Sequence, residues 1–231
     1  MKNKAIKRSI DTLMLILLPL LMSYSLIGEE THEWLGIVMF GLFVLHHIIN
    51  YRWFKNILRG KYTPQRILIT VVNLLLLAVM PALPITGILM SKYVLTDIQA
   101  SGGYATIRQL HPFFAYWGLV LMSIHLGFHM NMMLKKPLDK IKKSKAKQWT
   151  ATVILFAVFC YGGYVFVKRE ILRFLFLQNQ FHFFNAEQSR AIFFLDYLAI
   201  IAAFVILGVL QMKAVDIYSK SKQKLSNKER K

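Results

Sequence analysis

Six of the seven histidines in this 231-residue chain fall in two apolar stretches, three in each. The first stretch holds His32, His46 and His47, and the second holds His111, His125 and His129. Ionisable side chains are costly inside a membrane span, and where they occur they mark functional sites. Imidazole is also a frequent ligand of haem iron. These residue types indicate a buried cofactor, and their spacing indicates which one.

The spacing of the histidines is the same in both stretches. His32 and His46 are 14 residues apart, and so are His111 and His125. In a helix, 14 steps bring a side chain back to within about 40° of its starting direction and move it about 21 Å along the axis. Two such helices running in the same direction predict bis-histidine ligation of two b-type haems stacked across the bilayer. We expect His32 to meet His111 on the outer side and His46 to meet His125 on the inner side.

The inner site has competing ligands. His47 is turned about 60° from His32, against about 40° for His46. His129 lies about one turn beyond His125 and faces nearly the same way, so it is an alternative ligand, a proton donor at a quinone site, or a residue that faces the haem. We take His46 and His125 as the ligands, with His47 and His129 as alternates. The seventh histidine, His182, is interpreted as a surface residue.

Three glycines lie close to the predicted ligands. Gly118 is midway between the two histidines of the second stretch, on the same face. Gly36 and Gly127 lie within about a turn of ligands. Small residues beside a macrocycle let a helix approach it closely. We expect Gly118 to lie between the two haem levels.

The histidines lie in apolar blocks that are about as long as a membrane-spanning helix, and we expect these helices to position them. A helix needs roughly 20 apolar residues to cross a bilayer core, and its backbone must pair internally in lipid. Six blocks approach this length, at 10–28, 34–51, 67–91, 112–133, 150–167 and 191–210. The predicted fold class is an all-α integral membrane protein with six transmembrane helices. We expect a four-helix dihaem bundle over 1–134, a basic cytoplasmic loop over 135–148, and a further transmembrane pair with an outer loop and basic tail over 149–231.

The formal net charge of +18 is distributed unevenly. Of the 29 Lys and Arg residues, 23 fall in 2–8, 52–66, 135–147 and 213–231. This positive-inside pattern predicts a multi-pass protein of the cell membrane with both termini in the cytoplasm, and it explains the charge without nucleic acid. Arg108 outside, and Arg52, Lys55 and Arg66 inside, are candidate partners of haem propionates; contact with lipid headgroups is the alternative.

Other metal chemistry fits the sequence less well. The single cysteine, Cys160, excludes a Cys-x-x-Cys-His haem attachment and a four-cysteine iron–sulfur site, so a haem would be held noncovalently. A zinc or ion transport site would need ligands clustered within a turn, usually with a carboxylate. Asp196 is the only acidic residue deep in a predicted span. In a further alternative, the histidines only form hydrogen bonds between helices. That role would not require the interval of 14 residues to occur in both stretches.

The two histidine stretches resemble a known family, the flavinylation-associated cytochromes of bacteria. The first signature corresponds to His32-Glu33-Trp34-Leu35-Gly36, followed by His46, Asn50 and Trp53. The second corresponds to His111, Ala115-Tyr116-Trp117-Gly118 and His125-Leu126-Gly127-Phe128-His129. Segments 164–168, 183–184 and 195–198 are similar to the C-terminal extension of some members. There is a more distant likeness to ferric reductases and to the b-type cytochromes of respiratory complexes.

The resemblance implies that His32, His46, His111 and His125 ligate haem, and that electrons pass to extracytosolic proteins carrying covalently attached FMN. We therefore expect an electron-transfer subunit of a membrane oxidoreductase system, with a cytoplasmic-side or quinol donor. No glycine-rich dinucleotide motif follows a strand, so substrate oxidation is left to partners or to a quinone pocket. The alternatives are a haem-binding sensor or assembly subunit without sustained electron flux, and a metal transporter.

Overall fold

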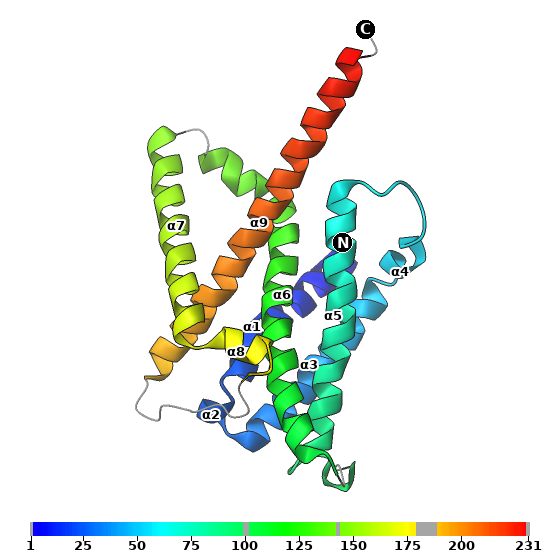
Figure 1. The fold of residues 1–231 in the computed structure, drawn as a ribbon, viewed down its shortest axis with the longest axis vertical. Helices are drawn as coiled ribbons and strands as arrows, with labels where there is room; N and C mark the ends of the chain where they lie inside the picture. Colours follow the sequence, from blue (N-terminus) through cyan, green and yellow to red (C-terminus); the bar gives the residue numbers. More distant parts are fainter. Residues whose placement is uncertain (1, 99–101, 142–143, 179–188, 230–231) are drawn as a thin grey trace.

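The computed structural model describes residues 2–98, 102–141, 144–178 and 189–229 (Figure 1). The elements in chain order are α1 (Lys2–Met22), α2 (Tyr24–Ile27), α3 (Glu29–Ile49), α4 (Arg52–Asn56), α5 (Pro64–Leu89), the 3₁₀ turn η1 (Thr96–Ile98), α6 (Tyr104–Ile141), α7 (Lys145–Lys168), α8 (Ile171–Leu175) and α9 (Arg190–Glu229). These ranges contain helices and connections but no strand. The predicted all-α class is confirmed.

Five helices of the described chain are long and apolar enough to cross a membrane. They are α3, α5, α6 as far as Met130, α7, and α9 as far as Gln223. The chain is therefore a multi-pass membrane protein, as predicted. The basic connection expected as a loop over 135–148 is largely helical, because α6 continues to Ile141 and α7 begins at Lys145.

The expected first span, 10–28, is divided in the structure and is not among those five helices. Helix α1 carries charged side chains at Lys7, Arg8 and Asp11, and it ends at Met22. The single turn α2 follows, and Gly28 then adopts a φ of 85°, which only glycine reaches without strain. This glycine lets the chain reverse direction, so that α3 returns along α1, and the two helices pack together.

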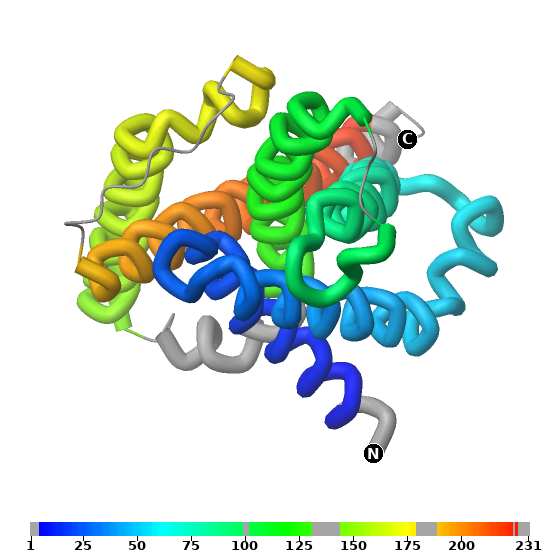
Figure 2. The backbone as a smooth tube through the Cα atoms, turned by 90° about the horizontal axis from the view of Figure 1, so that it is seen from below, coloured from blue at the N-terminus to red at the C-terminus, as the bar shows by residue number. Residues whose placement is uncertain are grey.

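Helix α6 lies at the centre of the molecule. Figure 1 shows α5 on one side of it and α9 on the other, with α7 beyond α9. Figure 2 shows α1 and α3 together across one face of this row. The two histidine helices, α3 and α6, pack against each other less closely than α5 packs against α6. This arrangement leaves room for a cofactor between them.

Glycines bring α9 into backbone contact with its neighbours. A Cβ atom on Gly127 of α6 would lie 2.3 Å from the Val205 carbonyl oxygen, and one on Gly208 of α9 would lie 2.6 Å from the Ile124 carbonyl oxygen. Gly127 therefore serves the α6–α9 contact, and its interpretation as a haem-facing residue is wrong. The C-terminal helices consequently pack directly on the helix that carries the second set of histidines.

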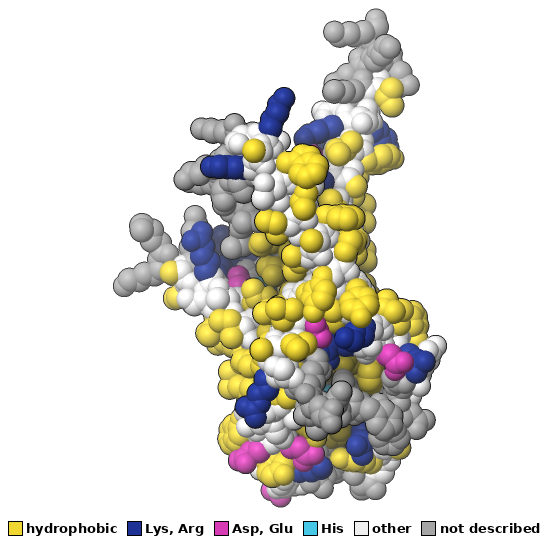
Figure 3. All heavy atoms as spheres, turned by 90° about the vertical axis from the view of Figure 1, so that its left-hand side faces the viewer, with side chains coloured by type: hydrophobic (Ala, Val, Ile, Leu, Met, Phe, Trp, Pro, Cys, Tyr) yellow, Lys and Arg dark blue, Asp and Glu magenta, His cyan; other side chains and the backbone are white. Residues whose placement is uncertain are grey.

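The outer surfaces of the long helices are apolar. Figure 3 shows hydrophobic side chains over the middle of the face that includes α7. On α7 the exposed fractions of Val153, Ile154 and Phe156 are 47%, 57% and 68%. Such surfaces would be costly in water, and contact with lipid chains explains them.

The segment after α7 is buried on one side and exposed on the other where the structure describes it. In the short helix α8 (Ile171–Leu175), the side chains at both ends are at most 7% exposed. Leu172 and the following Phe176 are 46% and 64% exposed. The Trp117 indole of α6 donates a hydrogen bond to the Leu175 carbonyl oxygen at 3.1 Å. Residues 179–188, which include His182, lie outside the described residues.

Candidate haem-binding sites

The outer histidines face each other between α3 and α6. The ring centroids of His32 and His111 are 6.1 Å apart, with an interplanar angle of 77°. Two imidazoles that ligate one metal from opposite sides, each with about 2 Å between metal and nitrogen, have ring centres roughly 6 Å apart. The structure thus brings together the two residues that were paired by depth in the sequence. Their spacing suits a shared metal ion, and ligation itself stays a prediction.

The hydrogen bonds of His111 select the tautomer that a ligand needs. Its Nδ1 lies 3.0 Å from the Thr86 hydroxyl oxygen. That hydroxyl has one hydrogen, and it lies 2.9 Å from each of the carbonyl oxygens of Ala82 and Leu83, to which it donates. The Thr86 oxygen therefore accepts from Nδ1–H of His111. The Nε2 lone pair is left available for iron, as in other histidine metal ligands.

The partner ring of His32 is buried and incompletely bonded. Its Nδ1 is buried and makes no hydrogen bond in the described structure. The ring lies edge-on to Tyr24, with centroids 5.3 Å apart. A buried polar atom without a partner is rare and needs an explanation, and an absent ligand is one such explanation. This unpaired nitrogen is compatible with a cofactor in the space beside the ring.

A cavity of about 470 Å³ adjoins both outer histidines. Its lining includes His32, His111, Gly36, Gly87 and Gly118, and its volume is in the range of cofactor pockets. A Cβ on Gly36 would have no atom within 4 Å, whereas a Cβ on Gly87 would lie 3.4 Å from Cε1 of His111. The small residues thus leave open the space beside the imidazoles. A planar macrocycle held by two imidazoles fits this chemistry.

Gly118 lies on the cavity wall, as the sequence suggested for a position between the two haem levels. A Cβ there would lie 3.4 Å from Cδ1 of Leu83 and 3.5 Å from Sδ of Met80, which are ordinary contact distances with α5. Gly118 is therefore shared between the cavity and the α5–α6 contact. Arg108 also lines the cavity, so its predicted pairing with a propionate is sterically consistent.

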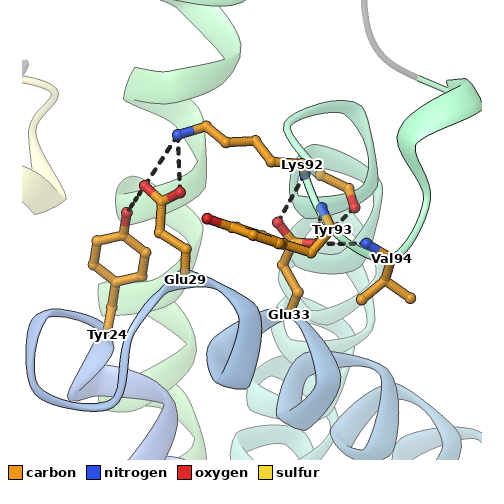
Figure 4. A network of polar contacts seen from close by, with 7 residues as sticks. Tyr24, Glu29, Glu33, Lys92, Tyr93 and Val94 are labelled. Carbon is orange, nitrogen blue, oxygen red and sulfur yellow. Dashed lines mark hydrogen bonds and ion pairs between the residues drawn. The ribbon is translucent and has the colours of Figure 1, made fainter.

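Acidic residues of α3 tie its first turns to the connection after α5 (Figure 4). The Glu33 carboxylate accepts hydrogen bonds from the backbone N–H groups of Lys92, Tyr93 and Val94 at 2.8–3.1 Å. It also accepts one from the Ser91 hydroxyl at 2.7 Å. Because Glu33 follows His32 directly, these bonds hold an outer ligand candidate beside the cavity rim.

A second acid, Glu29, completes this network. Its carboxylate accepts from the Lys92 ammonium at 2.9 and 3.0 Å and from the Tyr24 hydroxyl at 2.6 Å. The hydrogen bond to Glu29 raises the pKa of Lys92, so this ammonium stays charged at the rim. Burial, followed by the hydrogen bond to Glu29, raises the pKa of Tyr24, so its hydroxyl stays protonated.

The inner histidines form a cluster in place of a single facing pair. The rings of His46 and His47 on α3 have centroids 5.5 Å apart, and those of His125 and His129 on α6 are 4.7 Å apart. His125 is close enough to both α3 histidines for electrostatic interaction. Among the described side chains, no ring contact joins the two helices at this level. The structure brings all four candidates into one region without selecting one residue from each helix.

Nδ1 acceptors are also present in the inner cluster. Nδ1 of His46 lies 2.9 Å from the Asp11 carboxylate, and Nδ1 of His125 lies 2.9 Å from Oδ1 of Asn73. Nδ1 of His47 lies 2.9 Å from the Phe43 carbonyl oxygen of the same helix. Each acceptor favours the Nδ1–H tautomer and leaves Nε2 available. All three residues are therefore chemically prepared to be ligands.

Sequence reasoning missed the residues that orient the histidines. Thr86 and Asn73 belong to α5, and Asp11 belongs to α1. Asn73 and Thr86 are polar side chains within a block that is otherwise almost entirely apolar, and that contrast was the available signal. Asp11 lies near the end of a basic segment, and nothing local in the sequence marks it as a histidine partner.

A compact metal-transport site is not supported by the described part of the chain. It contains no group of three or more His, Cys, Asp or Glu residues placed to hold a metal ion. Asp196, the deep acid of the last span, is bonded elsewhere: it accepts from Arg169 at 2.7 and 3.1 Å and from the Tyr161 hydroxyl at 2.7 Å. Its side chain is 5% exposed and is neutralised by Arg169, so it has a structural partner.

Membrane-spanning helices, a facing pair of buried imidazoles and an adjoining cavity define a membrane cytochrome of the b type. Residues 10–143, more than half of the chain, match the family model described as prokaryotic cytochrome b561. The chain belongs to that family. Comparisons with curated proteins and with solved structures found no significant match. The expected class, a bacterial membrane b-type cytochrome, is confirmed, and with it haem b binding and transmembrane electron transfer.

Proposed function

We propose that the chain binds two b-type haems and carries electrons outward, from a cytoplasmic-side or quinol donor to an extracytosolic flavoprotein that carries FMN. The observation that supports it most is the interval of 14 residues present on both α3 and α6, together with the 6.1 Å approach of His32 and His111 at its outer end. The same interval carries the chain to His46 and His125, about 21 Å further along the helices.

In this proposal the histidines hold the cofactors and the surrounding helices exclude water. Bound haem iron supplies reversible one-electron redox chemistry. His32 and His111 hold the outer group through Nε2, and His46 and His125 hold the inner group, with His47 and His129 as alternates. Arg108 and Lys92 line the outer cavity and supply positive charge for propionates.

The direction of transfer follows from the predicted topology. From the basic segments we expect both termini and the α3–α5 connection in the cytoplasm. The start of α1 lies at the inner level, because Lys7 bonds to Asn50 and Asp11 to His46. The outer cavity then opens toward the extracytosolic side, where Tyr93 and Tyr104 are exposed at 54% and 41%. An acceptor that docks at this rim would come close to the outer pair. In this proposal the FMN belongs to the acceptor, since the described residues form helices only and contain no glycine-rich motif after a strand.

Electron transfer across a sealed membrane tests the proposal. The purified haem-loaded protein would be placed in vesicles that contain ferricyanide, and dithionite would be added outside. We expect ferricyanide absorbance to fall at a rate proportional to the protein, and to fall at the rate of protein-free vesicles for His111→Ala. The variant Cys160→Ala, at an exposed position on α7, is the control and should retain the wild-type rate.

A haem-binding sensor would give a different result. Its haem would be reduced by external dithionite, but the trapped ferricyanide would persist. That outcome would contradict sustained electron transfer while leaving haem binding intact. A separate addition of a purified FMN-carrying flavoprotein to the reduced cytochrome tests the acceptor: re-oxidation of the haem bands is expected, and unchanged bands would exclude that acceptor.

A further inference from the structure

Three of the candidate ligands receive a side-chain acceptor from a neighbouring helix, and these acceptors differ in charge. His111 bonds to the neutral hydroxyl of Thr86 and His125 to the neutral amide of Asn73, both on α5. His46 bonds to the carboxylate of Asp11 on α1. The one anionic acceptor among the three therefore belongs to the inner level.

A carboxylate that accepts the hydrogen bond from Nδ1–H changes the basicity of a ligating imidazole more than a neutral acceptor does. It makes the imidazole a more basic ligand, and it adds negative charge close to the metal. Both effects favour the oxidised over the reduced iron and so lower the reduction potential. A hydroxyl or amide oxygen in the same position does this less, because it carries only a partial charge.

The surroundings of Asp11 preserve this influence. Its side chain is 56% exposed, which weakens its field at long range, but the direct 2.9 Å bond to His46 does not depend on long range. Within the described residues, His46 is its only ion-pair partner. The nearby Lys7 ammonium donates instead to Oδ1 of Asn50 at 3.0 Å. Asp11 therefore bonds directly to His46, and it acts on His125 and His129 of the same level only through space.

The outer level lacks a comparable anion on its histidines. Nδ1 of His32 makes no hydrogen bond in the described structure, and Nδ1 of His111 meets the neutral Thr86 hydroxyl. The nearest acid along α3, Glu33, is occupied by the backbone N–H groups after α5. No carboxylate of the described residues therefore bonds directly to an imidazole of the outer pair.

We propose that Asp11 is a positioning residue that sets the inner haem at a lower reduction potential than the outer haem. The bond between Asp11 and His46 would make electron flow from the inner to the outer level thermodynamically downhill. The inference rests on the proposed function, because it requires two haems and His46 as an inner ligand. It adds a specific residue of α1 and a direction to that proposal.

A potentiometric titration of the purified dihaem protein tests this role. Followed by the haem absorbance bands, the wild type should titrate in two steps. In Asp11→Asn, we expect the lower step to rise by at least about 59 mV, which is a tenfold change in the one-electron equilibrium constant. The higher step should not move. Asp11→Glu should restore the wild-type value, and Asp216→Asn, the same change at an acid paired with Lys220 on α9, should leave both steps unchanged.

The outcomes separate this inference from the proposed function. Two haems with unchanged steps in Asp11→Asn, or a shift of the higher step, would overturn the role of Asp11 and leave the dihaem proposal standing. Loss of the inner haem in Asp11→Asn but not in Asp11→Glu would show that Asp11 retains the haem and does not tune it, which also overturns the inference. Two haems in His46→Ala would also overturn the inference, because His47 would then be the inner ligand, and would leave the dihaem proposal standing. A single haem in the wild type would instead contradict the proposed function.

Discussion

The outer and inner histidine groups differ in how clearly the structure pairs one histidine of α3 with one of α6. At the outer level each helix offers one imidazole, and the two rings meet at 6.1 Å beside a cavity. At the inner level each helix offers two, and the closest rings belong to the same helix, at 4.7 Å and 5.5 Å. A single residue per helix fixes a pair by geometry alone. Where there are two, hydrogen-bond partners have to select the ligand.

The two levels are also braced differently. The outer level is held by Glu33 and Glu29, which bind the connection between α5 and α6. The inner level is held by α1, through the bond from Asp11 to His46 and the bond from Lys7 to Asn50. The outer brace thus involves loop backbone, and the inner brace involves another helix. Changes at the rim should therefore act on the outer haem alone.

The largest expected effect is on the outer haem. His111→Ala removes one of two facing ligands, and we expect it to abolish haem binding at that level because no second imidazole of α6 lies within reach. The measurement is haem content per chain by pyridine haemochrome. His129→Ala should retain full content, since His125 remains. A fully loaded His111→Ala protein would show that the outer pair is not a ligand pair.

The next effect concerns the helix contact that supports both levels. Gly127→Ala places a methyl group 2.3 Å from the Val205 carbonyl oxygen, so α6 and α9 must separate. Overpacking of this kind costs about 1–3 kcal/mol, and we expect lower thermal stability together with loss of haem at both levels. Gly163→Ala, on α7 with no atom near its Cβ position, is the matched control and should behave as wild type. Equal stability of the two variants would contradict the close contact.

A smaller effect is expected at the rim. Glu33→Gln replaces charge-assisted hydrogen bonds with neutral ones, a loss of about 1–3 kcal/mol that partial exposure moves toward its lower end. We expect faster release of the outer haem to apomyoglobin, followed by absorbance, with an unchanged inner haem. Glu30→Gln at an exposed position is the control. Release from both levels at equal rates would mean that the network does not belong specifically to the outer site.

An effect of similar size should come from the acceptor of His111. Thr86→Val removes the hydroxyl but keeps the shape, so the imidazole keeps its place and loses its Nδ1 partner. Loss of the group that orients a histidine ligand typically weakens metal binding 10–100-fold, and the electron paramagnetic resonance signal of the outer haem should shift. Thr86→Ser should restore both. An unaltered signal in Thr86→Val would show that the hydroxyl does not orient the ring.

The sequence was sufficient for features that depend on one helix at a time. Hydropathy predicted the all-α membrane class, and the interval from His111 to Gly118 and on to His125 predicted which residues share a face. A common depth in the membrane paired His32 with His111 across helices, and the structure places them face to face. These predictions succeed because the rise and twist of a helix are nearly constant.

Features that depend on contacts between helices could not be predicted from the sequence. The function of Gly127 is decided by α9, which is distant in sequence. The bond between Asp11 and His46 depends on the reversal at Gly28, which the hydropathy pattern hid within one apolar block. In the same way, the Nδ1 acceptors of His46 and His125 come from α1 and α5, and the choice among the inner histidines stays a prediction. Tertiary contacts, which periodicity does not encode, decide all three.

The central claim is that two haems are held by histidines of α3 and α6, one by His32 and His111 and the other by His46 and His125. The most direct test is the haem-to-protein ratio of the wild type, His32→Ala, His46→Ala and the double variant, each purified after expression with excess haem. We expect ratios of about two, one, one and zero, with His47→Ala retaining the wild-type value. A ratio of one in the wild type, or a double variant that still binds haem, would contradict this claim.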